Sequence, residues 1–193
     1  MNDSAFPKSL VASLLLAGLV ACRAEKPRDT IELVVPDGSG RTVELAPRSA
    51  FAEYVEVPES ANELRVTLAS YDVSCERYVA PGADDTVLVV TLKLPPGEKP
   101  RPGSFASTRP LSEDGGSPLG RAYAVPVIRR GARGHALPPG GTLELELVEF
   151  GRSGVVKGAV AFEFPGDGTR PASSAKGKFS ARLCRHDEAP ITR

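Results

Sequence analysis

The sequence predicts an all-β protein, an immunoglobulin-like antiparallel β-sandwich of about nine or ten strands. Three observations lead to this prediction. Short segments in which apolar and polar residues alternate recur along the chain, as expected of half-buried strands. The 19 glycines and 18 prolines punctuate these segments without forming repeats, which is typical of a turn-rich β protein. No segment keeps a 3.6-residue apolar period over three turns, so we expect no packed helix in the folded domain.

The first predicted strands form a hairpin. Apolar residues alternate within residues 31–35 and 41–45, on either side of the turn Asp37-Gly38-Ser39-Gly40. Two alternating segments around a Gly-rich turn indicate a β-hairpin. A weaker alternation follows over residues 51–57.

The middle of the chain contains the most buried predicted strand. Residues 64–69 alternate cleanly, and we expect that segment to run on to Cys75. Residues 87–94 are apolar on nearly all positions of both faces, which predicts a central strand buried on both sides. The Pro/Gly/Ser-rich stretch 95–120 follows, with one short strand expected around 104–107. A loop this long is either functional or mobile.

Four further strands are expected in the second half. Residues 123–127 alternate, and the proline within them favours an edge position, because proline cannot donate to a ladder. Residues 143–147 alternate until the pattern shifts by one residue at Val148, which predicts a bulge. Apolar residues then line one face of residues 156–164 and one face of residues 179–183.

The N-terminal segment has the features of an export signal. An apolar run from Leu10 to Val20 ends at the motif Leu19-Val20-Ala21-Cys22. The run is shorter than the ~20 apolar residues that a membrane-spanning helix needs, and it fits the apolar region of a signal peptide. The motif resembles the lipobox of bacterial lipoproteins. This resemblance implies that residues 1–21 are removed and that Cys22 becomes a fatty-acylated N-terminus. The alternative is an ordinary signal peptide cut near Ala24, which would discard Cys22.

A domain order and a location follow from the lipobox and the composition. Residues 22–29 are expected to form a tether, residues 30–186 the β-sandwich domain and residues 187–193 a flexible tail. Arg23, rather than aspartate, follows the acylated cysteine, and by the family's sorting convention this implies passage to the outer membrane. The membrane is then a partner through the lipid anchor, and we expect no cofactor and no metal.

The two other cysteines have a simple interpretation once Cys22 is acylated. In an exported protein, Cys75 and Cys184 most simply form one disulfide. The alternatives are two free buried thiols or a metal site, although two cysteines without a neighbouring histidine pair make a poor zinc site. Cys184 falls on the strand face opposite Phe179 and Leu183. A bridge would therefore tie the outer face, or a covering loop, rather than cross the core.

Residues 60–185 also follow a recognisable arrangement. A strand ends shortly before a cysteine, a Pro/Gly-rich middle follows, and the segment Gly177-Lys178-Phe179-Ser180-Ala181-Arg182-Leu183-Cys184 closes the domain. This pattern resembles uncharacterised exported β-sandwich lipoproteins of Gram-negative bacteria. The resemblance transfers no catalytic residue.

The charge of the chain is balanced, with 24 Lys and Arg against 24 Asp and Glu. This balance argues against a nucleic-acid binder. One local cationic stretch contains Arg129, Arg130, Arg133 and His135. It is a candidate anion-binding loop for a phosphate, a carboxylate or a lipopolysaccharide head group, because arginine forks suit such groups. The simpler interpretation, which we favour, is a solvated connection whose charges protect a sheet edge.

Candidate catalytic and metal-binding residues are sparse. The tripeptide His186-Asp187-Glu188 lacks the converging ligands of a metal site, and the chain has no Gly-x-Ser-x-Gly nucleophile elbow. The recurring Asp-Gly pairs are typical of tight turns rather than of calcium loops. Tyr71 and Tyr78, which flank Cys75, are the one aromatic pair that we would test for sugar stacking.

The sequence therefore predicts a non-enzymatic outer-membrane lipoprotein that serves as a binding or structural module facing the periplasm or the cell surface, with a protein or cell-envelope component as its partner. One alternative is a periplasmic hydrolase with a site near His135. Another is a chaperone or inhibitor that pairs through an edge strand. The loops expected at residues 95–120 and 129–141 are where we look first for function.

Overall fold

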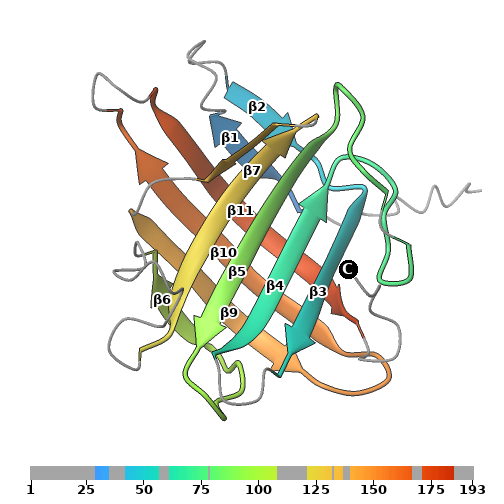
Figure 1. Ribbon diagram of the computed structural model, residues 1–193, viewed down its shortest axis with the longest axis vertical. Helices are drawn as coiled ribbons and strands as arrows, with labels where there is room; N and C mark the ends of the chain where they lie inside the picture. The colour runs from blue at the N-terminus through green and yellow to red at the C-terminus, as the bar shows by residue number, and fades with distance from the viewer. Residues whose placement is uncertain are drawn as a thin grey trace, which may run out of the picture.

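The computed structural model describes residues 29–34, 42–56, 61–77, 79–107, 121–131, 133–136, 140–166 and 171–184, without the side chains of residues 133–136 and 164 (Figure 1). The segments expected to form the signal peptide, most of the tether and the C-terminal tail lie outside these residues. The described chain contains eleven strands and no helix: β1 (Ile31–Val34), β2 (Thr42–Leu45), β3 (Ser49–Val55), β4 (Asn62–Ala69), β5 (Thr86–Leu94), β6 (Gly103–Ala106), β7 (Tyr123–Arg130), β8 (Arg133–Ala136), β9 (Gly141–Glu149), β10 (Val155–Phe164) and β11 (Ser173–Leu183).

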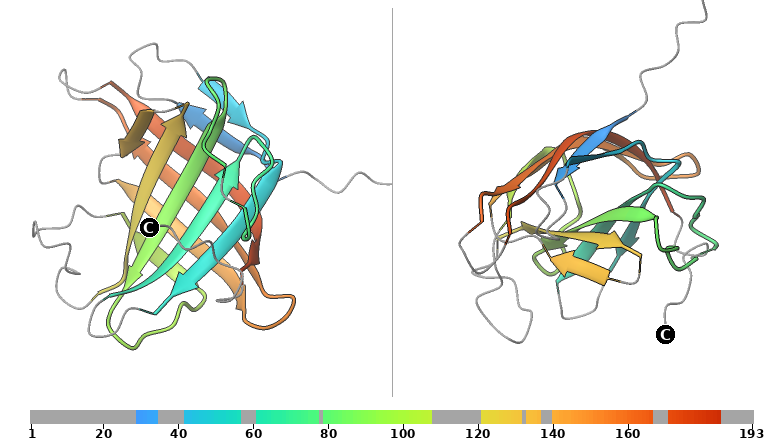
Figure 2. Two further views of the ribbon diagram at one scale, coloured as in Figure 1. Left: turned by 45° about the vertical axis from the view of Figure 1, so that its right-hand side comes forward. Right: turned by 90° about the horizontal axis from the view of Figure 1, so that it is seen from above.

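The strands belong to one mixed sheet that is nearly closed into a barrel. Its order is β6-β9-β10-β11-β3-β4-β5-β7-β8, with the β1–β2 hairpin attached to β11. An isolated bridge between Ser107 and Ala124 joins the end of β6 to β7 and narrows the opening. Figure 2 shows β10 and β11 arching over the layer that contains β5 and β7. The all-β prediction is confirmed.

The two-sheet immunoglobulin-like arrangement is not confirmed, because the ladder is continuous between the two layers. Strand β11 makes this continuity possible by pairing with two different strands along one edge. Its first half pairs with β1 in antiparallel fashion, and its last two residues pair with β3 in parallel. Gly177 lies where β1 begins, and a Cβ atom there would stand 2.2 Å from the carbonyl oxygen of Thr30. Glycine therefore permits the close approach that the branched ladder requires.

A single apolar core fills the space between the layers. It consists of every second residue along the strands, the ones that face inward. The β1–β2 hairpin contributes Ile31, Leu33 and Leu45 to it, each at most 1% exposed. The predicted hairpin is confirmed, with Ile31 opposite Leu45. It packs against this core because its inner face is wholly apolar.

Several strand-level predictions are confirmed. Strand β5 is central, between β4 and β7, and a short strand, β6, lies inside the stretch 95–120. The bulge in β9 is present, since Leu145 and Leu147 face the adjacent residues Gly158 and Lys157 and leave Glu146 as the extra residue. A bulge inserts one such residue and shifts the alternation.

Three predictions need correction. The strand expected to run on to Cys75 ends at Ala69, and Cys75 lies in a loop. The loop expected over residues 129–141 is in part a hairpin, in which β8 pairs with the end of β7. Strand β7 is not an edge strand, because it lies between β5 and β8 in the sheet order. Within the described residues, β8 pairs with Val127 and the residues after it, so Pro126 lies just beyond that ladder.

Candidate functional site

The connection between β4 and β5 is a closed surface loop, residues 70–85, which we call the stapled loop. Its two ends meet: the backbone N–H of Ser70 donates to the carbonyl of Thr86 over 3.0 Å, and the N–H of Thr86 donates to the Ser70 hydroxyl over 2.9 Å. A compact loop of this length with adjacent ends is an Ω-loop, a type that is frequently functional. Tyr78 lies outside the described residues.

A disulfide fixes the middle of the stapled loop to the end of β11. Cys75 and Cys184 are bonded, with 5.6 Å between their Cα atoms, as predicted from the sequence. They are 2% and 8% exposed, so the bridge is shielded from solvent. The N–H of Cys184 also donates to the carbonyl of Ala52 over 2.7 Å, which anchors the bridge to β3. The bridge ties a covering loop to the sheet and does not cross the core, as the position of Cys184 predicts.

Beneath the stapled loop lies a second, smaller apolar cluster on the outer face of the sheet. Phe51, Ala69 and Val87 contribute from β3, β4 and β5, and Val73 covers them from the loop beside the disulfide. Because alternate residues of a strand point to opposite faces, these outward-facing apolar side chains need cover of their own. The stapled loop provides it, which explains why this part of the sheet is apolar on both faces.

The tip of the β7–β8 hairpin contacts the stapled loop. The N–H of Gly131 donates to the carbonyl of Asp85 over 3.1 Å. Gly131 has a φ of 56°, and a Cβ atom there would come within 3.3 Å of the Ala83 carbonyl oxygen. A residue with a side chain would be strained in this position. The loop and the hairpin tip therefore form one continuous surface.

The candidate anion-binding residues fall within this hairpin. Arg129 and Arg130 are consecutive residues of β7, so their side chains leave opposite faces of the strand; Arg129 is exposed and Arg130 half-buried. The register pairs Arg130 with Arg133, and Ile128 with His135. The side chains of residues 133–136 lie outside the described part of the chain, so an anion site there stays a prediction. Arg129 and Arg130, however, do not converge on one ligand.

Exposed charged side chains line the rim of the stapled loop and pair with the neighbouring strands. The Arg48 guanidinium lies 3.0 Å from the carboxylate of Asp72, and that of Arg182 lies 3.9 Å from the carboxylate of Glu76. The Ser74 hydroxyl donates to Glu76 over 2.8 Å, and this hydrogen bond is the main reason why the pKa of Glu76 lies below its ordinary value. The loop thus combines a buried apolar underside with a charged, exposed top.

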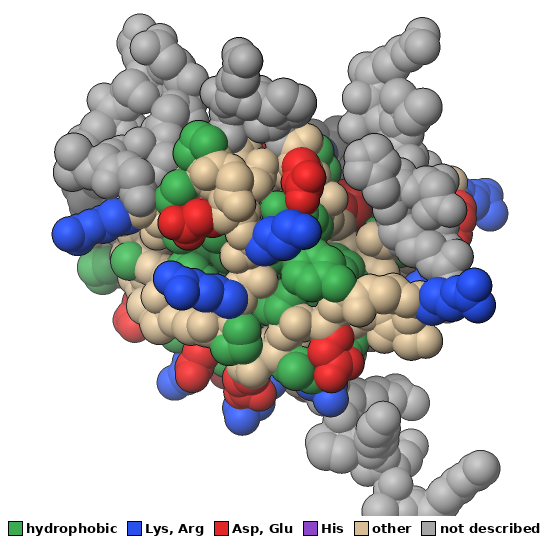
Figure 3. Space-filling model, turned by 90° about the horizontal axis from the view of Figure 1, so that it is seen from below, with side chains coloured by type: hydrophobic (Ala, Val, Ile, Leu, Met, Phe, Trp, Pro, Cys, Tyr) green, Lys and Arg blue, Asp and Glu red, His purple; other side chains and the backbone are tan. Residues whose placement is uncertain are grey.

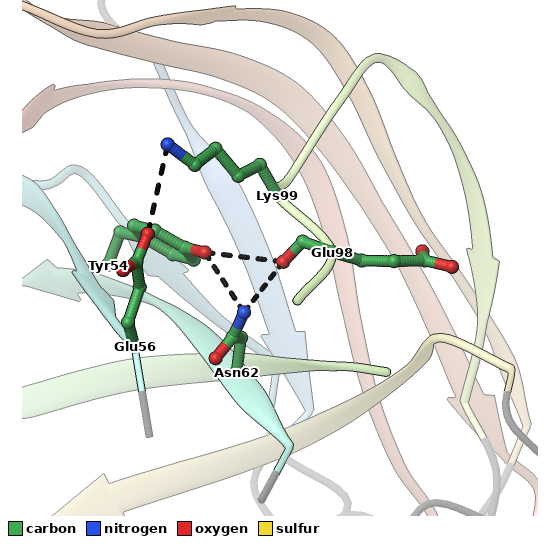
Figure 4. A network of polar contacts seen from close by, with 5 residues as sticks. All are labelled: Tyr54, Glu56, Asn62, Glu98 and Lys99. Atoms are coloured by element: carbon green, nitrogen blue, oxygen red, sulfur yellow. Dashed lines mark hydrogen bonds and ion pairs between the residues drawn. The ribbon is translucent and has the colours of Figure 1, made fainter. Parts of the chain in front are cut away.

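A different arrangement fixes the opposite end of the molecule. The lower end, at the bottom of Figure 1, is where β3, β5 and β9 finish. There the side-chain amide of Asn62 donates to the Glu98 carbonyl over 2.9 Å and to the Tyr54 hydroxyl over 3.2 Å. The Tyr54 hydroxyl in turn donates to the same carbonyl over 3.2 Å. Figure 4 shows this triangle of neutral groups, which fastens the loop after β5 to β3 and β4.

An aromatic pair and an ion pair flank this triangle. The ring of Phe150 meets the ring of Tyr54 edge-on, with centroids 5.7 Å apart, a favourable aromatic geometry. Lys99 lies 3.8 Å from the carboxylate of Glu56. Burial raises the pKa of the Tyr54 hydroxyl, and the neighbouring charge of Glu56 raises it further. The hydroxyl is therefore kept protonated, as a hydrogen-bond donor must be.

Between the two ends, charged side chains occupy the outer face of β3, β4 and β5. Glu63 bonds to Lys93 and lies 3.6 Å from the guanidinium of Arg65. Burial raises the pKa of Glu53, against the opposing influence of Arg65. Burial, with a smaller contribution from Glu63, also raises the pKa of Tyr123. These side chains lie across neighbouring strands and stabilise one another.

Sequence analysis missed the lower-end triangle. Neither Tyr54 nor Asn62 stands in a motif, and Glu98 contributes only a backbone carbonyl. Among the described residues, no group of three or more His, Cys, Asp or Glu side chains could hold a metal ion, and no helix there is long and apolar enough to cross a membrane. Both histidine side chains, and hence the predicted hydrolase site, lie outside the described residues.

Comparison of the chain with protein-family models, with curated proteins and with solved structures finds no match.

Proposed function

We propose that this chain is an exported, lipid-anchored and non-enzymatic outer-membrane module, and that the stapled loop with the adjoining hairpin tip is its partner-binding surface. The lipid is carried by Cys22, and residues 22–29 tether the domain to the membrane. The partner is a protein or another component of the cell envelope. The module presents a rigid, charged surface to that partner.

The Cys75–Cys184 disulfide is the observation that carries this proposal. Structural disulfides form and persist in oxidising compartments outside the cytoplasm, and a shielded bridge of this kind supports export. It also engages two of the three cysteines in the chain. Cys22 is left as the remaining thiol, at the position where the lipobox requires one.

The surface of the stapled loop supports a binding role. Binding residues are often found on loops held in place by a rigid scaffold. Here the disulfide, the apolar underside and the Ser70–Thr86 bonds restrain the loop, so little conformational entropy is lost when a partner docks. Val79, which is 37% exposed, stands on this surface together with exposed charges such as Asp84.

The anchor is tested by replacing Cys22 with alanine. In the native host, the wild-type protein should incorporate labelled palmitate and sediment with membranes, whereas Cys22→Ala should lose the label and leave the membrane fraction. The double variant Cys75→Ala/Cys184→Ala is the matched control, because it removes the two other cysteines but should keep the label. Palmitate incorporation by Cys22→Ala would contradict the lipobox assignment.

The binding surface is tested by site-specific photocrosslinking in intact envelopes. A photoreactive residue at Val79 or Asp84 should give one discrete adduct, and the same residue at Lys157, on the opposite outer face, should give none. Equal adducts from both faces would contradict the proposed surface. An activity in a broad substrate screen that His135→Ala abolishes would contradict the non-enzymatic assignment.

A further inference from the structure

The disulfide joins two residues that are far apart in the sequence and that meet only when the sheet is complete. Cys75 lies in the stapled loop, and Cys184 follows β11, the last strand of the described chain, 109 residues later. Strand β11 pairs with β10, β1 and β3, and the pairing with β3 leads Cys184 to its place beside Ala52. Because contacts between distant residues form slowly, this native pair of cysteines meets late in folding.

Until then, a third cysteine competes for Cys75. Cys22 is about half as far from Cys75 in the sequence as Cys184 is. The entropic cost of closing a loop of n residues rises as about (3/2)RT ln n, so in an unfolded chain Cys22 meets Cys75 about three times as often as Cys184 does. Cys22 and Cys184 are the most distant pair and meet least often. With three free thiols, the native bond should be only about a fifth of the first disulfides formed.

The order of synthesis strengthens this competition. The N-terminal part of a chain is made first, at about 5–20 residues per second, so Cys22 and Cys75 are both present for about 5–20 s before Cys184 is added. Disulfides form and exchange by attack of a thiolate, which needs access to the sulfur. The folded domain is closely packed, as the described side chains of its lower end show (Figure 3), and both Cys75 and Cys184 are buried. Folding therefore protects the correct bond, but a wrong bond formed earlier keeps Cys75 from Cys184.

A wrong bond would affect the stapled loop directly. A disulfide between Cys22 and Cys75 leaves Cys184 as a free thiol and removes the covalent link between the loop and β11. The loop would keep its apolar underside and its hydrogen bonds, such as the one from the Val73 N–H to the Ser49 hydroxyl over 3.0 Å. It would lose the restraint that makes its surface rigid, so the proposed binding surface depends on correct pairing.

We propose that acylation of Cys22 precedes oxidation of Cys75 and Cys184 and serves as the thiol-protecting step in the maturation of this chain. This order rests on the proposed function, which places the lipid on Cys22. Acylation replaces the S–H bond of Cys22 by an S–C bond, and the proton passes to the leaving group of an activated lipid donor. A disulfide oxidant then takes two protons and two electrons from the other two thiols: its own S–S bond breaks, and the bond between Cys75 and Cys184 forms. Only this one disulfide is then possible.

Oxidation of the unacylated full-length chain in urea tests the competition. The reduced chain is treated with oxidised glutathione and quenched with acid at early times, and its disulfides are mapped by mass spectrometry. Bonds between Cys22 and Cys75 should outnumber those between Cys75 and Cys184 about threefold. Cys22→Ser is the matched control, because a serine oxygen, like an acylated sulfur, forms no disulfide. After removal of the urea, this variant should yield about five times as much correctly bonded protein as the wild type. Native bonds that predominate in the unfolded wild type would overturn the proposal.

Pulse-chase labelling of the wild type in the native host tests the order of the two steps. Labelled palmitate follows the lipid, and an alkylating agent added at each time blocks the thiols that are still free. Acylated chains with two free thiols should appear first, and every chain with the bond between Cys75 and Cys184 should carry the lipid. Disulfide-bonded chains that acquire the lipid later would overturn the order and leave the lipid anchor standing. A wild type that incorporates no palmitate would instead remove the anchor, and with it the proposed function.

Discussion

Two loops of this molecule are fastened to the same strands by different means. The stapled loop, residues 70–85, precedes β5, and the lower-end loop, residues 95–102, follows it. A disulfide and a small apolar cluster hold the first. Three hydrogen bonds among neutral groups, centred on Asn62, hold the second. The loop before β5 is thus held by a covalent bond, and the loop after β5 is held by hydrogen bonds.

The difference follows from what each loop covers. The stapled loop lies over outward-facing apolar side chains of β3, β4 and β5, so an apolar underside stabilises it, and the disulfide keeps the cover in place. In the lower-end loop, the group that needs a partner is the backbone carbonyl of Glu98, which lies in a partly buried position. A carbonyl removed from water without a donor would cost free energy. The side-chain amide of Asn62, which is 4% exposed, is therefore a suitable partner where a further apolar cluster would not be.

Removal of the disulfide should have the largest effect on stability. For a bridge between residues 109 apart, the chain-entropy model predicts that Cys75→Ala/Cys184→Ala lowers the free energy of unfolding by up to about 4–5 kcal/mol. Urea denaturation measures this loss. Hydrogen exchange should accelerate first in the stapled loop and leave the lower-end loop protected.

Cys22→Ala is the control for this comparison, because it removes a thiol outside the described fold and should leave the unfolding free energy unchanged. Equal stability of the double variant and the wild type would show that the apolar cluster alone holds the loop. Exchange that accelerates equally at both ends would show that the two fastenings are one cooperative unit.

Replacement of Asn62 should have the second largest effect, and it should be confined to the other end. Asn62→Ala leaves the Tyr54 hydroxyl and the Glu98 carbonyl without their shared donor, and loss of a buried hydrogen-bonding partner costs about 1–3 kcal/mol. Urea denaturation gives the loss, and hydrogen exchange should now increase at residues 95–102. Faster exchange in the stapled loop instead would contradict the separation of the two ends.

Tyr54→Phe sharpens the measurement, because it keeps the ring contact with Phe150 and removes only the hydroxyl. Its loss should be smaller than that of Asn62→Ala. The double variant Tyr54→Phe/Asn62→Ala should lose less than the sum of the single losses, since residues that share a bond are coupled. Strict additivity would show that the triangle does not act as a unit.

Replacement of Glu53, which lies on β3 between the two loops, should have a smaller effect on the free energy of unfolding, and this effect should depend on pH. Its pKa in the folded state lies above the ordinary value of 4.5, because burial disfavours the charged form. Stability from the protonated form is therefore present at low pH and lost as the pH rises through the folded-state pKa. Glu53→Gln should be more stable than the wild type at pH 7, by less than about 1 kcal/mol.

The gain from Glu53→Gln should shrink as the pH falls through the folded-state pKa toward 4.5, and it should be absent below 4.5, where the wild-type carboxyl is neutral in both the folded and the unfolded state. Thermal unfolding at a series of pH values measures it. The matched control is Glu63→Gln, which removes a carboxylate bound to Lys93 and should destabilise the protein at pH 7. A Glu53→Gln variant less stable than the wild type at pH 7 would show that the contact with Arg65 outweighs the cost of burial.

The sequence predicted the disulfide that holds the stapled loop but not the hydrogen bonds that hold the lower-end loop, and the reason is physical. Once Cys22 is assigned to the lipobox motif, only two cysteines are left in the chain, so residue type alone indicates the bond between Cys75 and Cys184. The nearly continuous apolar run over residues 87–94 likewise indicates a buried strand, because the hydrophobicity of each side chain follows from its residue type. The lower-end triangle depends on the position of a backbone carbonyl, at Glu98, and every residue carries one.

The path of the sheet was also beyond what local patterns can predict. Alternation specifies which residues face inward, but it does not specify which strands are neighbours. The parallel pairing of β11 with β3 and the bridge from Ser107 to Ala124 join residues far apart in sequence. These long-range contacts turn the expected two-layer sandwich into one nearly closed sheet.

The exposed ion pairs on the stapled loop should contribute least. Arg48 and Asp72 lie 3.0 Å apart, but their side chains are 65% and 80% exposed, and such pairs contribute less than about 1 kcal/mol. Arg48→Ala should therefore change the unfolding free energy by less than about 0.5 kcal/mol at moderate salt. The remaining effect should vanish at about 1 M salt, because screening there acts within about 3 Å. A loss as large as that of Asn62→Ala would mean that this pair, and not the apolar underside, keeps the stapled loop closed.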